Sequence, residues 1–120
     1  MRTLFMLTLL CLPLVAADMT VKQYQKEVHS SDRDRADAVK MYVIGIGQGI
    51  AWANGGREEQ RAPIRQPPKF SRDRNNYIDI LDKMIKTFES KTTAKDLNEF
   101  PVGMLLIMGL QQTFPCQTAK

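Results

Sequence analysis

The residues that could carry out chemistry are few and scattered along this chain of 120 residues. His29 is the only histidine, and Cys11 and Cys116 are the only cysteines. A nucleophilic site needs a base beside its Ser or Cys, and a zinc site needs several His, Cys or acidic ligands gathered together. The sequence shows neither arrangement, and its acidic residues fall in loops or on faces expected to be exposed. We therefore predict that the protein is not an enzyme and binds no metal or cofactor.

The glycines Gly45, Gly47 and Gly49 are the remaining chemical candidate, because glycine-rich loops can cradle phosphates. A dinucleotide fingerprint requires G-x-G-x-x-G between a strand and a helix, with an acidic residue about 20 positions later. Here the spacing differs, and the glycines lie inside a helical pattern. Apolar residues recur every three or four positions at Ala36, Val39, Val43, Ile46, Ile50 and Ala53, which predicts one face of a helix. The apolar run at positions 41–53 is short of the ~20 residues of a membrane span.

A second apolar stripe on the same helix predicts that other helices surround it. This stripe has the same spacing and consists of Ala38, Tyr42, Gly45, Gly49 and Trp52. Gly45 and Gly49 each cost about 1 kcal/mol relative to Ala in a helix interior. We expect that cost to be offset by a neighbouring helix approaching closely where the Cβ atoms are missing. The side chains of Ser30, Ser31 and Asp32 can cap the start of this central helix.

The rest of the chain predicts an all-α bundle of about four to five helices. Val21–Val28 is a short amphipathic helix, and a second clear helix begins near Asn75, with Asp79/Lys83 and Asp82/Lys86 as i,i+4 pairs on its outer side. A short turn at Ala94–Leu97 leads to Pro101, which can open the last helix. Val102–Leu110 is apolar nearly all round, so we expect it in the core or at a contact between subunits.

The first 17 residues have the pattern of a secretory signal peptide. Arg2 is followed by the apolar run Leu4–Leu14 and then by small residues before Asp18. We predict cleavage there, a single domain at residues 18–120 and a periplasmic location. Removing Arg2 lowers the formal net charge from +4 to +3, which gives no reason to expect nucleic acid as a partner. Cys116 would then be the remaining cysteine, either buried or available for a bridge between molecules.

The segment Arg57–Arg74 separates the two long helices and is rich in charge and proline. Its few apolar residues include Ile64 and Phe70, so we expect it to lie outside the core. A segment of this length is either functional or a solvated connector, and the sequence leaves both open. If it binds a partner, the best candidates are Glu58, Glu59, Arg61 and Arg65.

Several short motifs together resemble the Rap/Tai immunity proteins of type VI secretion amidase effectors. They are Tyr42-Val43-Ile44-Gly45-x3-Gly49, Pro68-x-Phe70-Ser71, the helix around Ile80–Phe88 and the closing Phe114-Pro115-Cys116. The resemblance implies an exported, all-helical and commonly dimeric protein that binds a peptidoglycan amidase and blocks its active site. It assigns structural roles to Tyr42, Gly45, Gly49, Phe70, Phe114, Pro115 and Cys116. The chain departs from the family pattern at Val39 and Ser71, where many family members carry cysteines.

Two further expectations follow. We expect a homodimer with Val102–Leu110 at or beside the contact, because this helix is too apolar to be solvated. The alternative to an immunity protein is a periplasmic helical holdase, which would bind unfolded chains through exposed apolar surface. A neighbouring gene for an amidase would favour the first.

Overall fold

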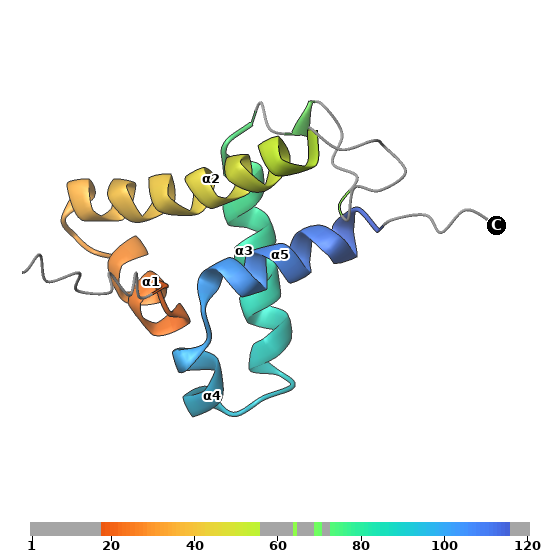
Figure 1. Cartoon of the computed structure of the whole chain (residues 1–120). Helices are drawn as coiled ribbons and strands as arrows, with labels where there is room; N and C mark the ends of the chain where they lie inside the picture. The colour runs from red at the N-terminus through yellow and green to blue at the C-terminus, as the bar shows by residue number, and fades with distance from the viewer. Residues whose placement is uncertain (1–17, 56–63, 65–68, 71–72, 116–120) are drawn as a thin grey trace, which may run out of the picture.

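The computed structural model describes residues 18–55, 64, 69–70 and 73–115 (Figure 1). The predicted signal peptide, the four candidate binding residues Glu58, Glu59, Arg61 and Arg65, and Cys116 lie outside these residues. The described chain forms five helices and no strand, which confirms the all-α prediction: α1 (Val21–Val28), α2 (Arg33–Gly55), α3 (Asn75–Glu89), α4 (Ala94–Glu99) and α5 (Val102–Thr113). None of the described helices is long and apolar enough to cross a membrane.

Local side chains fix where the helices begin. At α1, the Thr20 hydroxyl accepts from the Gln23 backbone, and the Gln23 side chain accepts in return from the Thr20 backbone, forming a capping box. At α2, the Asp32 carboxylate accepts from the backbone N–H of Asp34 at 3.1 Å and of Arg35 at 3.4 Å. The predicted start of the central helix is therefore confirmed, with Asp32 as its cap.

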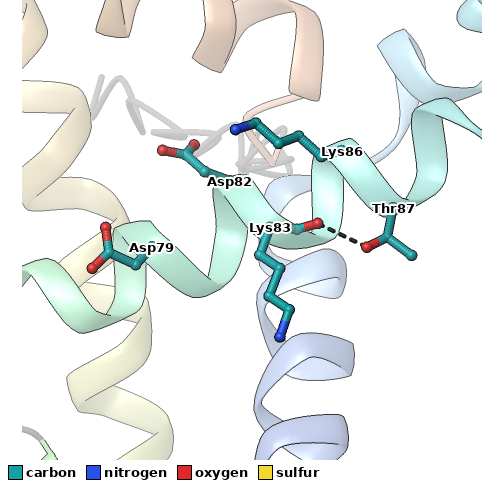
Figure 2. Close-up of a pocket in the computed structure, with 5 residues that line it drawn as sticks. All are labelled: Asp79, Asp82, Lys83, Lys86 and Thr87. Carbon is teal, nitrogen blue, oxygen red and sulfur yellow. Dashed lines mark hydrogen bonds between the residues drawn. The ribbon is translucent and has the colours of Figure 1, made fainter.

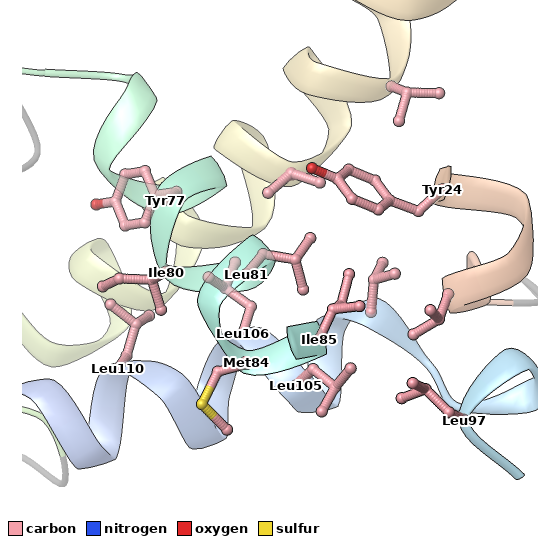
Figure 3. Close-up of a cluster of buried hydrophobic side chains, with 14 of the residues drawn as sticks. Tyr24, Tyr77, Ile80, Leu81, Met84, Ile85, Leu97, Leu105, Leu106 and Leu110 are labelled. Carbon is pink, nitrogen blue, oxygen red and sulfur yellow. The ribbon is translucent and has the colours of Figure 1, made fainter. Parts of the chain in front are cut away.

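The core forms where α3 and α5 cross, and α2 lies against both of them (Figure 1). Helix α1 packs on α2 and α4, so that the two short helices close one end of the bundle. The largest fully buried side chains come from α1, α3 and α5 (Figure 3): Tyr24, Tyr77, Leu81, Leu105, Leu106 and Leu110. The apolar character of Val102–Leu110 is thus largely explained by burial within a single chain.

Two glycines allow the helices of this core to approach closely. A Cβ atom at Gly109 would lie 2.5 Å from Ile80 Cγ2 and 2.7 Å from Met84 Cγ, so α5 and α3 are in backbone-to-side-chain contact there. A Cβ atom at Gly47 would overlap the ring of Tyr77. The ring therefore lies directly on the Gly47 backbone, and this contact brings α2 close to α3. Close packing at a glycine, expected at Gly45 and Gly49, occurs instead at Gly47.

The prediction that α2 is covered on both apolar stripes is wrong within one chain. The first stripe faces the core, where Val39 and Val43 are buried. On the second stripe, a Cβ placed at Gly45 or at Gly49 would meet no atom of the described residues within 4 Å beyond the adjacent backbone of its own helix. The side chain of Trp52 is 85% exposed. Helices α1, α3 and α5 pack on the core side of α2, and its second stripe faces away from the bundle.

Candidate functional site

Two residues tie the segment between α2 and α3 to the core. Ile64 is only 3% exposed and belongs to the main apolar cluster. The ring of Phe70 packs edge-on against Tyr77 at 5.4 Å and against Phe114 at 4.8 Å between centroids. The Asn76 amide nitrogen also donates to the Phe70 carbonyl at 2.9 Å. The expectation that this segment lies outside the core is therefore wrong for Ile64 and Phe70.

The structure describes six of the seven structural residues named by the resemblance, all except Cys116. Phe70 and Phe114 pack together with Tyr77, so a packing role fits both. Gly45 and Gly49 are exposed, and packing among the described residues does not account for them. Tyr42 is 37% exposed and lines a hollow beside α1. Pro115 is exposed at the end of the described chain.

The exposed stripe of α2 is the most unusual surface that the structure describes. We call it the open face of α2, and it consists of Ala38, Met41, Tyr42, Gly45, Gly49 and Trp52, all of them exposed. Within the described residues, three of the four exposed large apolar side chains lie on it, at Met41, Tyr42 and Trp52. No charged residue occurs from Met41 to Gly55. A contiguous apolar surface without charge is typical of an interaction site.

A hollow of about 450 Å³ lies between this face and α1. Its lining includes Met19, Gln23, Lys26, Glu27 and, from the open face, Tyr42. The hollow therefore combines an aromatic ring and a methionine with one basic and one acidic side chain. It can receive a bulky apolar group with a polar edge, and the sequence pattern gave no sign of it because its walls come from two helices.

A second, polar hollow of about 520 Å³ lies along α3 (Figure 2). It is lined by Asp79, Asp82, Lys83, Lys86 and Thr87, and the Thr87 hydroxyl donates to the Lys83 carbonyl at 2.9 Å. The predicted i,i+4 charge pairs lie here, but the ion pairs formed by the described residues are those of Arg35 with Glu27 and Asp32. This surface is a solvated helix side of mixed charge.

The side chain of Tyr24 connects this hollow to the core, because it is buried and bonds to Asp82 in the lining. The Tyr24 hydroxyl donates to Asp82 Oδ1 at 2.8 Å (Figure 3 shows Tyr24). Burial, and then the hydrogen bond to the Asp82 carboxylate, raise the pKa of Tyr24 well above its ordinary value. The phenol therefore stays protonated and acts as a structural donor. No group of three or more His, Cys, Asp or Glu residues in the described part of the chain is placed to hold a metal ion.

Comparison of the chain with protein-family models, with curated proteins and with solved structures found no match. The resemblance to the Rap/Tai immunity proteins thus rests on the short motifs alone and remains a prediction.

Proposed function

We propose that this protein is a periplasmic immunity protein that binds a type VI secreted peptidoglycan amidase, occludes its active site and so protects the producing cell and its kin. The proposal draws on the motif resemblance and agrees with the all-α fold that the resemblance implies. The observation that carries it is the attachment of the charged α2–α3 segment to the core at Ile64 and Phe70.

This attachment argues against a loose solvated connector. Glu58, Glu59 and Arg61 precede Ile64 in the sequence, and Arg65 follows it directly. A segment held at buried points and stiffened by prolines loses less conformational freedom on docking than a free loop does. Arginine side chains supply planar, multi-donor contacts of the kind enriched at binding hot spots, and the two glutamates can meet a basic rim.

The test is binding of a purified amidase effector encoded beside this gene, measured by calorimetry. Alanine at Glu58, Glu59, Arg61 and Arg65 should weaken binding at least tenfold, about 1.4 kcal/mol, with helicity and melting temperature unchanged. The matched control replaces two acids and two bases between the end of α3 and the end of α4, Glu89, Lys91, Lys95 and Glu99, which are all exposed. Both variants leave the net charge unchanged, so equal losses would show that the effect is not specific to this segment and would contradict the proposed contact.

The open face of α2 favours a second candidate, the holdase. Its exposed Trp52 and Met41 offer apolar surface to unfolded chains. A holdase should suppress the aggregation of reduced α-lactalbumin at near-stoichiometric ratios, and Trp52→Lys should abolish that effect. An immunity protein should leave the aggregation unchanged.

A further inference from the structure

The open face of α2 has a feature that a general apolar surface does not need. Its central positions, Gly45 and Gly49, give up helix propensity, and the structure shows nothing packed against either of them. Gly47, two residues away, is buried against Tyr77, so packing within the chain explains only that glycine. Gly45 and Gly49 form an i,i+4 ridge of minimal height, which lets a second helix backbone approach closely.

The sequence of the open face is symmetric about residue 47. Gly45 and Gly49 are equally distant from that position, and so are Tyr42 and Trp52. A two-fold axis at this height would set two copies of α2 antiparallel, with Gly45 of each copy opposite Gly49 of the other. The same axis places Trp52 of the second copy at the helical turn that carries Met41 and Tyr42. The surface is therefore complementary to itself, as an isologous dimer contact requires.

In this arrangement, the Trp52 side chain of the second copy lies at the hollow beside Tyr42. Its volume of about 450 Å³ exceeds that of an indole ring, and Met19 and Tyr42 supply apolar wall. Lys26 adds a cation of the kind that binds the face of a tryptophan. Trp52 is the most exposed large apolar side chain among the described residues. Its 85% exposure shows that no hollow of its own chain encloses the ring among these residues.

Charge also favours a second copy over a charged partner. The run from Met41 to Gly55 contains no acidic or basic side chain, so two copies of this basic chain can meet there without repulsion. The contact spans the stripe from Ala38 to Trp52, about 21 Å of helix, at 1.5 Å per residue. A contact of one helix per copy is small, so we expect an affinity in the micromolar range.

We propose that two copies of this chain associate through the open faces of α2, antiparallel, with Gly45 and Gly49 at the crossing and Trp52 of each copy in the hollow beside Tyr42 of the other. The sequence alone placed a homodimer contact at or beside Val102–Leu110. The structure buries most of that helix in its own core and leaves the open face of α2 uncovered by the described residues. The association does not depend on an amidase, so it stands or falls separately from the proposed function.

Sedimentation of the protein tests the association. We expect a dimer at micromolar concentration, and we expect Gly45→Leu and Gly49→Leu to raise its dissociation constant at least tenfold, because either leucine separates the helices. Both sites have free space in one chain, so the variants should keep their helical circular-dichroism signal. Gln111→Leu is the matched control, since it adds a leucine to an exposed helix position away from the open face and should leave the dimer intact.

Cysteine cross-linking tests the antiparallel register. In a background with Cys11 and Cys116 replaced by Ser, the double variant Tyr42→Cys/Trp52→Cys should form disulfide-linked dimers on mild oxidation. Each single variant should link far less, because identical positions lie on opposite sides of the axis. A protein that remains monomeric up to roughly 100 μM, well above the micromolar range of small interfaces, would overturn the proposal. A dimer unaffected by either leucine, or one linked most readily through Trp52→Cys alone, would overturn it as well.

Discussion

Two alanine substitutions two residues apart on α2 should have opposite effects on stability. At Gly45 the added methyl group meets no atom within 4 Å, so the variant should gain about 0.5–1 kcal/mol from helix propensity. At Gly47 the same methyl group overlaps the ring of Tyr77, which is fully buried and cannot swing into solvent. Overpacking of this kind costs about 1–3 kcal/mol and exceeds the propensity gain. We expect the unfolding free energies of the two variants to differ by about 2 kcal/mol. Each kcal/mol corresponds to roughly 4–8 °C in melting temperature for a domain of this size.

Urea unfolding followed by circular dichroism measures both values. The comparison should be made at concentrations where the midpoint no longer depends on protein concentration, because association through α2 would otherwise add to the wild-type stability. Gly109→Ala serves as a second buried case and should also destabilise, since its methyl group meets Ile80 and Met84. If Gly47→Ala is as stable as Gly45→Ala, then α2 and α3 do not pack as closely as described, and the reasoning fails.

Three further substitutions test separate parts of the fold. Tyr24→Phe removes the hydrogen bond to Asp82 and should cost about 1 kcal/mol at neutral pH. Because the native fold raises the pKa of Tyr24 above the unfolded value of 10.0, its stabilising effect is complete below pH 10 and is lost as the pH rises further. Unfolding measured from pH 8 to 11 should therefore show a steeper decline for wild type than for Tyr24→Phe, and parallel curves would contradict this. Ile64→Ala should lower the unfolding free energy by about 2–4 kcal/mol, as in a core site, whereas a change below about 0.5 kcal/mol would return the α2–α3 segment to a solvated connector. Asp32→Ala should cost about 1 kcal/mol by removing the α2 cap, and Asp32→Asn should restore most of it, as a thermal-melting comparison of the two would show.

The sequence predicts the helices well because periodicity and capping are local. The α1 bounds and the start of α3 agree with the pattern, and Asp32 caps α2 as its side chain predicts. Pro101 lies one residue before α5 rather than at its first helical position, which is within the usual uncertainty of a helix end.

What the sequence could not decide is which apolar stripe of α2 faces the other helices. Both stripes repeat every three or four residues, and only the positions of α3 and α5 select one of them. The same limit explains why close packing was expected at Gly45 and Gly49 and not at Gly47. Only the position of α3 shows that the Tyr77 ring occupies the space of a Cβ atom at Gly47. Ile64 was also misplaced, since one isoleucine among charges and prolines carries no periodic signal.

The absence of charge on the second half of α2 is visible in the sequence, although it does not say which stripe is exposed. A stretch of fifteen residues without an acidic or basic side chain, on a helix that ends beside a charged segment, is unusual for a solvated helix. Its self-complementary order becomes visible only after the structure shows that Tyr42, Gly45, Gly49 and Trp52 share one exposed side.

The most direct test of the proposed function is titration of an amidase effector with this protein while the release of cleaved peptides from purified peptidoglycan is followed. A protein that occludes the active site should abolish hydrolysis at one chain per amidase, with a sharp end point at concentrations above the dissociation constant. Hydrolysis that continues unchanged at a tenfold excess, for every amidase encoded beside the gene, would contradict the account.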